Sequence, residues 1–466
     1  MTLFGIPIRA RQVLYLLGDL LMAFLAISFA HMTRYGPLSE HARLPFILRE
    51  TTAAVVFFVV VQLFLLYVAD AYNPGRDYRS LRDVVRFWSA IAVGLVLQMV
   101  FSYAFPQWWW GRGLTLLAGG AFAVLLPAWR AFVCTVSPAT AVRHRTVIVG
   151  AGRAGHALAE VLGQGAELGD SYELLGFIDD HVSSSPTGLP VFGGARDLVA
   201  VCQAQAVDRL IVAVRGGMSE LLTQELLECK ALGVGIADMP TVYKQITGKV
   251  PINHLADTWL IFGPGFLGES RVGAILHRIA DIVIASIGLV LSAPIIAVAA
   301  VAVKLDSPGP AFYLQARLGL GERPFTIIKL RTMGQQAEAG TGAVWSQGAS
   351  DPRVTRVGRV LRRSRIDELP QFWNVLRGDM SMVGPRPERE HFVRQLKQRI
   401  PFYGLRFAVR PGVTGWAQVM YRYGASEEDA AEKLRYELYA IQEMNPVLYA
   451  LILMKTVQTV LLRPGS

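Results

Sequence analysis

Long apolar runs alternate with short polar segments along the first third of the chain. The runs cover residues 12–32, 51–69, 84–105 and 114–136. Each run is close to the roughly 20 residues that an α-helix needs to cross the hydrocarbon core of a bilayer. The pattern therefore predicts four membrane-spanning helices over residues 1–136. Four buried helices of a soluble protein are the alternative, and they account less well for runs of this length.

Arginine is distributed unequally between the two sets of loops that flank these runs. One set carries Arg9, Arg11, Arg76, Arg79, Arg82, Arg86, Arg143 and Arg145. The other set carries Arg34, Arg43, Arg49 and Arg112. Because arginine-rich loops stay on the cytoplasmic side, both ends of the bundle are predicted to face the cytoplasm. The segment PQWWWGRG (106–113) then fits an aromatic belt at the opposite interface. The first run lacks a small-residue cleavage site, so it is expected to be a retained anchor.

Residues 145–260 change to short β-like runs alternating with helical runs. RTVIVGAGRAGHALAEVL, beginning at residue 145, has the pattern of a strand, a glycine turn and a helix. YELLGFIDD and DRLIVAV follow as two further strands, and ELLTQELLECKALGVGI is a helix that leads into another strand. This alternation predicts a Rossmann-like α/β domain with parallel strands over residues 137–262.

Three glycines in this domain match the G-x-G-x-x-G turn of dinucleotide-binding folds. Gly150, Gly152 and Gly155 follow the first strand and open the helix. Small residues in such a turn let a phosphate approach the helix N-terminus, and Asp179 or Asp180 is placed to meet a ribose. One interpretation is a nucleotide or sugar-nucleotide site. The other is that the glycines only form a tight turn in a module without a ligand.

Residues 263–466 form the third predicted domain, which opens with an apolar stretch at 282–306. The stretch is long enough to span a bilayer, but Pro294 lies at its centre. A proline inside a helix removes one hydrogen bond and costs about 3 kcal/mol or more. Freed backbone groups at mid-bilayer need partners, and the nearby Ser292 hydroxyl can supply one.

Two topologies remain open for this stretch. A kinked helix that crosses the bilayer would put the arginine-rich chain after residue 304 outside, against the positive-inside tendency. A helix-break-helix that re-enters the same membrane face avoids that outcome, and it is the hypothesis favoured here. It places four charged residues at the cytoplasmic surface, namely Arg278, Asp281, Lys304 and Asp306. The apolar run near the C-terminus is short and is expected to lie in the interface.

The amino-acid composition indicates which kinds of binding partner suit the chain. Of the 466 residues, 52% are hydrophobic and only 18% are charged, whereas soluble proteins average about 25% charged residues. The net charge of +10 suits anionic lipid headgroups or anionic substrates. We find no nucleic-acid-binding module in the sequence. The three cysteines lack metal-ligand spacing and are expected to be reduced thiols.

Basic side chains concentrate in two segments of the third domain. Lys329 and Arg331 lie two residues apart at the end of an expected strand, so they are predicted to share one face. Four arginines then recur at three- or four-residue spacing along an expected helix: Arg356, Arg359, Arg362 and Arg363. A solvated or headgroup-facing stripe is one interpretation of this helix face. A grip on a diphosphate is the other.

An acidic pair, Asp367 and Glu368, follows this basic helix. A lone acidic pair is usually surface charge. Here the many arginines next to it favour a functional site, and their positive charge helps to keep both carboxylates ionised. Such a pair can hold Mg²⁺ and leave positions for substrate phosphates. A carboxylate can also attack phosphorus to form an acyl-phosphate. Arg386 in the GPRP turn and the loop RPGVTGWAQV (410–419) are further candidates for presenting functional groups.

These motifs, in this order, resemble the catalytic unit of bacterial polyprenyl-phosphate phosphoglycosyl transferases. These monotopic sugar transferases begin exopolysaccharide and O-antigen assembly. The matching segments are DIVIASIGLVLSAP, KLDSPGPAFYLQARLG, FTIIKLRTM, SDPRVTRVGRVLRRSRIDELPQFWNVLRGDMSMVGPRP and VRPGVTGWAQV. The layout of four spans, a Rossmann-like domain and a catalytic unit resembles the large members of the family. The resemblance therefore covers nearly the whole chain.

The resemblance implies a two-step transfer at the acidic pair. Asp367 would attack the β-phosphate of a UDP-sugar and release UMP, and the phosphosugar would then pass to undecaprenyl phosphate. Mg²⁺ would be held by Asp367 and Glu368. Residues that match the phosphate-binding basic positions are Lys329, Arg331 and Arg386, and Arg363 of the arginine helix is a further candidate.

The resemblance also implies a location at the bacterial inner membrane. The catalytic and Rossmann-like domains would lie on the cytoplasmic side, against the inner leaflet, and a homodimer is compatible with the family. Members carry the re-entrant break, which supports that topology here. They often have Ser directly before Pro, whereas Ala293 separates Ser292 from Pro294 in this chain.

Two other functions compete with the transferase. A membrane-tethered NAD(P)-dependent sugar-nucleotide oxidoreductase or epimerase would work at the glycine turn, but residues 145–260 hold no Tyr-x-x-x-Lys pair for its chemistry. A non-enzymatic membrane scaffold with the α/β domain as a sensor would not need Asp367. The sequence does not name the sugar, and glucose and galactose are the common choices in the family.

Overall fold

The computed structural model describes most of the chain. The described residues are 2–3, 6–7, 10–36, 44–69, 71–72, 78, 81–106, 111–136, 144–164, 172–182, 184–214, 218–255, 271–334, 337, 351–421, 424 and 426–462. The chain divides into two compact units, the first comprising Met1–Leu3 with Pro7–Ala141 and the second comprising Phe4–Ile6 with Val142–Ser466. The predicted α/β and catalytic domains thus belong to one unit, and the boundary between them at residue 262 stays a prediction.

Four long apolar helices make up most of the first unit, as the hydrophobic pattern predicts. They are α1 (Ala10–Tyr35), α2 (Leu44–Val68), α3 (Leu81–Ala104) and α4 (Arg112–Val136), and two short strands precede them, β1 (Thr2–Leu3) and β2 (Ile6–Pro7). Helices α1, α3 and α4 are long and apolar enough to cross a bilayer. In α2 the side chains are described only from Thr52 onward, and this part of the helix, Thr52–Val68, is shorter. Most of the predicted aromatic belt, and the loop arginines Arg9, Arg43, Arg76, Arg79 and Arg143, lie outside the described residues.

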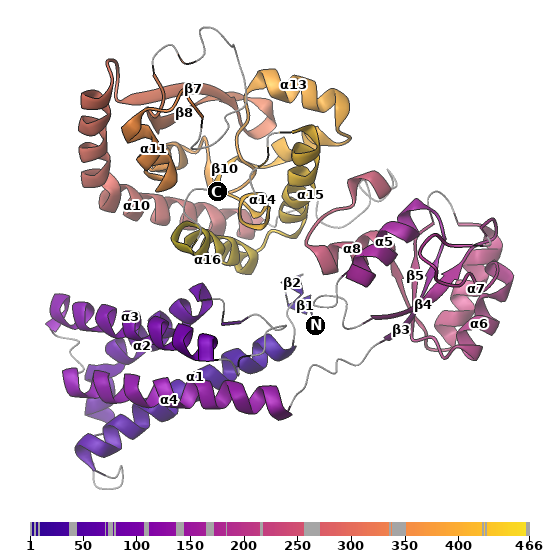
Figure 1. Cartoon of the computed structure of the whole chain (residues 1–466), viewed down its shortest axis with the longest axis horizontal. Helices are drawn as coiled ribbons and strands as arrows, with labels where there is room; N and C mark the ends of the chain where they lie inside the picture. The colour runs from indigo at the N-terminus through magenta and orange to yellow at the C-terminus, as the bar shows by residue number, and fades with distance from the viewer. Residues whose placement is uncertain are drawn as a thin grey trace. The chain divides into compact units, whose positions relative to one another are not determined.

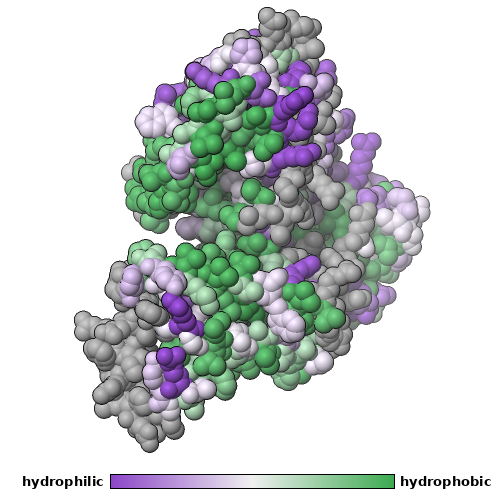
Figure 2. Space-filling model, turned by 60° about the vertical axis from the view of Figure 1, so that its left-hand side comes forward, coloured by the Kyte–Doolittle hydropathy of each residue, from purple (hydrophilic) through white to green (hydrophobic). Residues whose placement is uncertain are grey.

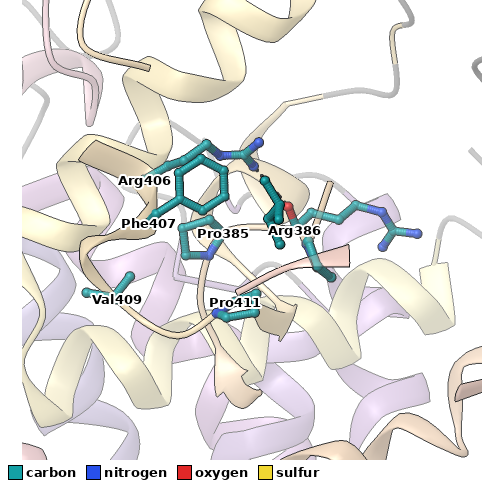
Figure 3. Close-up of a pocket in the computed structure, with 8 residues that line it drawn as sticks. Pro385, Arg386, Arg406, Phe407, Val409 and Pro411 are labelled. Atoms are coloured by element: carbon teal, nitrogen blue, oxygen red, sulfur yellow. Dashed lines mark hydrogen bonds between the residues drawn. The ribbon is translucent and has the colours of Figure 1, made fainter. Parts of the chain in front are cut away.

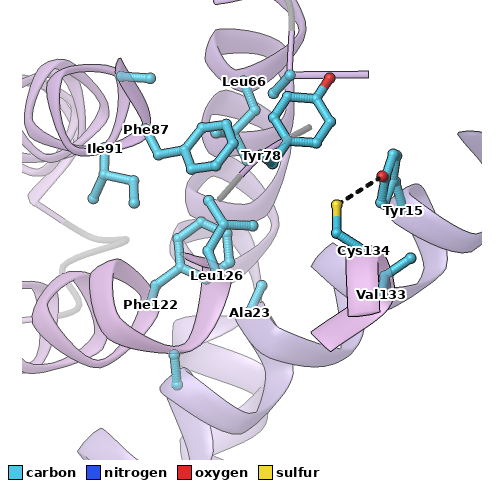
Figure 4. Close-up of a cluster of buried hydrophobic side chains, with 13 residues drawn as sticks. Tyr15, Ala23, Leu66, Tyr78, Phe87, Ile91, Phe122, Leu126, Val133 and Cys134 are labelled. Carbon is cyan, nitrogen blue, oxygen red and sulfur yellow. Dashed lines mark hydrogen bonds between the residues drawn. The ribbon is translucent and has the colours of Figure 1, made fainter. Parts of the chain in front are cut away.

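A buried ion pair lies among aromatic rings inside this unit. The Arg130 guanidinium of α4 donates to the Asp19 carboxylate of α1 at 2.6 Å, and neither side chain is exposed. The same guanidinium lies over the rings of Tyr15, Tyr72 and Tyr78 at 4.0–5.3 Å. Figure 4 shows Tyr15 and Tyr78 within the surrounding apolar cluster. Charged residues inside an apolar bundle are expensive unless paired, and this arrangement supplies both a counter-charge and cation–π contacts.

A parallel sheet of four strands organises the α/β part of the second unit, as predicted. The order is β4 (Tyr172–Ile178), β3 (His144–Val149), β5 (Arg209–Val212) and β6 (Gly235–Asp238). The helices are α5 (Arg153–Gln164), α6 (Leu198–Ala204), α7 (Glu220–Ala231) and α8 (Met239–Thr247), with 3-10 turns η3 (Ala195–Asp197) and η4 (Ile252–His254). Two buried clusters flank the sheet, one built on Ile148 and Ile211 and the other on Val147 and Leu210.

Helix α10 (Arg271–Asp306) contains the apolar stretch with Pro294 and runs in two arms that bend relative to each other in Figure 1. Many of its apolar side chains are exposed, among them Val290, Leu291 and Val298. Figure 2 shows exposed hydrophobic residues in green. The Arg278 guanidinium donates to the carbonyls of Val375 and Leu376 at 2.8 and 2.9 Å. These contacts join the first arm to the folded part that carries the acidic pair.

The second arm of α10 joins the same folded part. Its last residue, Asp306, accepts a hydrogen bond from the Val357 amide at 3.1 Å. Ala299 and Val303 of this arm also pack with Leu330 and Leu361. Both arms therefore contact one globular part, on either side of the proline.

The remaining elements surround these contacts. Strands β7 (Phe312–Leu318) and β8 (Pro324–Leu330) pair antiparallel around η5 (Leu320–Glu322), and β9 (Ser381–Val383) pairs parallel with β10 (Gly412–Thr414). The helices are α11 (Arg356–Arg363), α12 (Gln371–Arg377), α13 (Glu390–Arg399), α14 (Trp416–Met420), α15 (Glu427–Glu443) and α16 (Pro446–Leu462), with 3-10 turns η7 (Ile366–Glu368) and η8 (Tyr403–Ala408).

Candidate active site

Two cationic side chains from separate segments of the chain contact Glu368, which lies on a third segment. Lys329 Nζ, from β8, lies 2.9 Å from Glu368 Oε1. Arg386 Nη2, from the GPRP turn after β9, lies 2.6 Å from the same oxygen. Arg386 also donates to Gln418 Oε1 at 3.2 Å, which ties the turn to α14. The structure therefore brings together three of the predicted residues, far apart in sequence, with Gln418 of the candidate loop 410–419.

Asp367 differs from its neighbour in that one of its buried oxygens has no hydrogen-bond partner among the described residues. Its side chain is only 8% exposed, and Oδ1 is buried without a hydrogen bond from any described residue. Arg365, two residues earlier, adopts the left-handed conformation with φ of 57°. That turn ends α11 and starts η7, which carries the two carboxylates. A buried carboxylate oxygen without a partner is costly, and such groups are typical of reactive or ligand-binding sites.

The two carboxyl groups are driven in opposite directions by their surroundings. Burial raises the pKa of Asp367 to about 6, and the charge of Glu368 adds to the rise against the opposing effect of Lys329. Burial also acts to raise the pKa of Glu368, but Arg386 and Lys329 outweigh it and hold that pKa well below its usual range. Paired groups whose pKa values are pushed apart are a common arrangement in active sites. Glu368 is thus firmly ionised, and Asp367 is the less stabilised anion.

Two predicted phosphate ligands, Arg331 and Arg363, do not form ion pairs with Glu368 in the described contacts. Arg331 follows the end of β8 and is 5% exposed, and it donates to the carbonyls of Ser307 and Pro308 at 2.7 and 2.6 Å. Arg363 lies exposed at the end of α11. The contacts of Arg331 fix the turn that follows α10. Phosphate binding by these two residues stays a prediction.

Arg362 is the member of the arginine helix that approaches the acidic pair. It is partly buried, it donates to Thr332 Oγ1 at 2.9 Å, and its charge lowers the pKa of Asp367. Arg356 and Arg359, like Arg363, are exposed. The sequence placed Arg362 within the basic stripe, but the 3.6-residue spacing alone did not distinguish it from Arg363.

The loop at 410–419 packs closely on the GPRP turn. A Cβ at Gly415 would lie 2.2 Å from the Gly384 carbonyl, so a larger residue would force the two segments apart. This contact brings Gln418 to Arg386. The other candidates in the loop turn elsewhere, because Arg410 Nε donates to the Gly378 carbonyl and Thr414 pairs with Thr456.

The predicted role of Ser292 and Pro294 at a break in α10 stays a prediction. Ser292 is buried, and its hydroxyl lies 3.4 Å from the Leu289 carbonyl, three residues earlier. At that distance the hydrogen bond is long. The Leu289 carbonyl is not the one that Pro294 leaves without an amide donor, which belongs to Val290, four residues before the proline.

The glycine turn of the α/β part uses its own acidic residue internally. Asp179 Oδ2 accepts the Ala151 amide at 2.7 Å, and Oδ1 accepts the amides of His181 and Val182. A Cβ at Gly155 would lie 2.0 Å from the Gly150 carbonyl, whereas one at Gly152 would meet nothing within 4 Å. Two glycines thus serve the turn itself, and Gly152 is open to an approaching group. Nucleotide binding at these three glycines stays a prediction.

The residues present suit a magnesium ion shared with a substrate. Mg²⁺ is often held by one or two carboxylates together with substrate phosphates, and the unpartnered oxygen of Asp367 is a suitable ligand. No cluster of three or more His, Cys, Asp or Glu side chains occurs among the described residues. The donor set therefore fits a metal whose other ligands come from outside the protein.

Comparison with known proteins identifies the class to which this site belongs. Residues 272–463 match the family model for bacterial sugar transferases, and residues 67–239 match a model described as a CoA-binding domain. A UDP-glucose:undecaprenyl-phosphate glucose-1-phosphate transferase of Escherichia coli is 31% identical over 432 residues, which is 87% of each chain. The chain belongs to the bacterial sugar transferase family. It is accordingly an enzyme of the phosphoglycosyl transferase class, and the resemblance seen in the sequence is confirmed.

Other relatives of this transferase are named for different sugars. A UDP-N-acetylgalactosamine-undecaprenyl-phosphate N-acetylgalactosaminephosphotransferase of Aeromonas hydrophila is 44% identical over 52% of this chain and 56% of its own. A glucose-1-phosphate transferase of Caulobacter vibrioides is 51% identical over 32% of this chain and 55% of its own. The chain thus spans a little over half the length of these two relatives. The oxidoreductase alternative is not favoured, because the relatives are named as transferases.

Proposed function

We propose that this transferase moves a sugar phosphate from a UDP-sugar to undecaprenyl phosphate and releases UMP, as the first membrane step of exopolysaccharide or O-antigen assembly. The observation that carries the proposal is the pairing of Asp367, buried with one unpartnered oxygen, with a Glu368 that two cations hold. The names of relatives that act on UDP-sugars and undecaprenyl phosphate support it. The sugar is left open, since those names differ.

In the first step, an Asp367 carboxylate oxygen attacks the β-phosphorus of the donor. The bond from that phosphorus to the bridging oxygen breaks, and the electron pair leaves on UMP. The aspartate then carries the sugar phosphate as an acyl-phosphate. Lys329 and Arg386 lie beside Glu368, where their charge would stabilise the extra negative charge of the reacting phosphates.

In the second step, a phosphate oxygen of undecaprenyl phosphate attacks the same phosphorus. The bond to the Asp367 oxygen breaks, which restores the carboxylate and yields the lipid-linked sugar diphosphate. Glu368 stays ionised throughout because its two cations hold its pKa low, although burial alone would raise it. When bound at Asp367 and Glu368, Mg²⁺ would neutralise phosphate charge and orient the donor.

Trapping experiments test this function. The full chain in detergent is incubated with a panel of UDP-sugars, with and without undecaprenyl phosphate, and UMP release and intact mass are measured. One donor should add the mass of a sugar phosphate to Asp367 and should release further UMP only when the lipid is present. A metal chelator should stop both signals, and Mg²⁺ should restore them. Multiple turnover without any adduct at Asp367 would contradict the covalent mechanism.

We further propose that α10 enters the membrane and returns to the cytoplasmic face. A straight helix of the 25 residues between Asp281 and Asp306 would extend about 37 Å, more than the roughly 30 Å of the hydrocarbon core. If α10 crossed, its two arms would emerge on opposite sides. Contacts from both arms to one globular part support a re-entrant course instead.

Labelling of spheroplasts tests this topology. A cysteine at Lys304, which is exposed at the end of α10, should resist a membrane-impermeant maleimide and react only after the inner membrane is permeabilised. Arg34, exposed at the predicted outer end of α1, provides the matched control and should react in spheroplasts without permeabilisation. Reaction at residue 304 from outside would refute the re-entrant course.

A further inference from the structure

Arg386 is held both by its side chain and by its backbone, each through a different residue. Its guanidinium binds Glu368, and its backbone carbonyl accepts a hydrogen bond from Arg406 Nη2 at 2.9 Å. Figure 3 shows Arg406 and Phe407 beside the Pro385–Arg386 segment, with the Arg386 side chain extended away from them. The position of the Arg386 backbone therefore depends on where Arg406 is placed.

Arg406 is itself fixed by helix α15. Its guanidinium is 5% exposed, and it donates to Glu437 Oε1 at 2.8 Å and to the Tyr403 hydroxyl at 2.6 Å. Glu437 is 6% exposed and lies in the middle of α15. Buried ion pairs add little net stability compared with apolar replacements, because desolvation offsets the attraction. A directional role, in which Glu437 aims Arg406 at the Arg386 carbonyl, accounts for the pair better than stability does.

A second group of contacts on α15 comes from the α/β part of the chain. Lys244 of α8 is 7% exposed, and its ammonium donates to Glu443 at 2.5 Å and to Gln442 at 3.2 Å. Lys249 forms an ion pair with Glu432 and lies over the Tyr436 ring at 5.0 Å. These ion pairs join segments more than 180 residues apart in sequence.

Backbone contacts complete this docking. The Val250 amide donates to the Arg435 carbonyl at 3.0 Å, and Trp416 Nε1 donates to the Gly248 carbonyl at 3.0 Å. Trp416 also stacks on Tyr439 of α15, with ring centroids 5.8 Å apart. The segment 244–250 thus contacts α15 along most of the length of that helix.

Helix α8 connects this docking surface to the glycine turn. Met239 and Val242 of α8 share a buried cluster with Ala151 and Ala154, which lie within the G-x-G-x-x-G turn and at the start of α5. We propose that docking of α8 and residues 248–250 on α15 positions Arg386 for catalysis through the Glu437–Arg406 pair. This inference rests on the proposed function, and it makes Lys244, Lys249 and Glu437 positioning residues.

Steady-state kinetics on the full chain test the proposal. The double variant Lys244→Met and Lys249→Met keeps the apolar stems but removes both docking charges. Small displacements of a catalytic group can cost up to about a hundredfold in rate, so we expect kcat to fall by about tenfold with KM for the UDP-sugar little changed. The paired arginine variant, Lys244→Arg with Lys249→Arg, should recover most of the lost kcat.

A matched control and a second variant make the test decisive. Lys230→Met replaces an exposed lysine of α7, in the same α/β part of the chain, and it should leave kcat unchanged. Should the double lysine variant not fold, Glu437→Gln tests the same path and should also lower kcat. Unchanged kcat in folded docking variants, or a loss that the arginine pair does not restore, would overturn the proposal. Absence of UMP release from the wild type would instead refute the proposed function.

Discussion

Asp367→Asn is expected to lose at least about a thousandfold in kcat, because it removes the proposed nucleophile, and yet to be more stable than the wild type above pH 6. Burial, with the nearby charge of Glu368, raises the pKa of Asp367 to about 6, compared with an ordinary value near 4. The folded state therefore binds this proton more tightly than the unfolded state does. The corresponding stability is fully present below about pH 4, and it is lost as the pH rises from there to about 6.

The asparagine side chain avoids that loss because it carries no charge at any pH. A shift of two pKa units corresponds to about 3 kcal/mol, and solvent that reaches the apo site should reduce the observed gain to about 1–3 kcal/mol. Unfolding of both proteins in detergent without divalent metal, at pH 5 and pH 8, measures the difference. We expect the difference between the two stabilities to be clearly smaller at pH 5 than at pH 8, because the loss develops progressively between about pH 4 and pH 6. Substantial UMP release by the variant would reject Asp367 as nucleophile, and lower stability at pH 8 would reject the burial argument.

Asp281→Ala is expected to cause the largest loss of stability outside the active site. One carboxylate oxygen of Asp281 accepts hydrogen bonds from the Ser381 hydroxyl, the Met382 amide and the Tyr449 hydroxyl at 2.7–3.0 Å. The residue is 2% exposed, so its removal leaves three buried donors without this acceptor. Each hydrogen bond to a charged group contributes about 1.5–3 kcal/mol. We expect a total loss of about 3–5 kcal/mol, since the site would relax in part.

The isosteric variant Asp281→Asn provides the control, because its carbonyl oxygen can still accept these bonds. It should lose markedly less stability than the alanine variant. Thermal unfolding in detergent micelles measures both variants against the wild type. Equal destabilisation by alanine and asparagine would mean that the charge, and not the hydrogen-bonding geometry, accounts for the effect. An alanine variant as stable as the wild type would contradict the assigned role of Asp281 in joining α10 to β9 and α16.

Local patterns in the sequence predicted those elements whose signal is local. The apolar runs located α1, α3 and α4 within three residues at each end, whereas α2 starts seven residues before its predicted run. The strand, turn and helix pattern located β3 and α5. The Asp367–Glu368 pair was found because it follows a dense basic helix. In each instance, hydrophobic periodicity or charge spacing within about 20 residues carried the information.

Contacts between distant segments were not predictable in the same way. Arg331 was expected to share a face with Lys329, but β8 ends at Leu330 and the arginine turns to the carbonyls at 307 and 308. Arg362 approaches Asp367 while Arg363 is exposed, a difference that depends on where α11 starts. Arg406 and Glu437 carry no local motif, since their role appears only when η8 and α15 lie together.

The Arg130–Asp19 pair has a consequence for biogenesis. Its two members are 111 residues apart, so α1 leaves the ribosome long before its partner charge is synthesised. Asp19 lies nine residues after the start of α1 and Arg130 six residues before the end of α4, so each alone would meet part of the roughly 2.5–3.5 kcal/mol that a charge costs at the centre of an inserted helix. The first helix therefore gains its full preference for the lipid phase only once the fourth has emerged from the translocon. We therefore expect stable insertion of α1 to require the synthesis of α4.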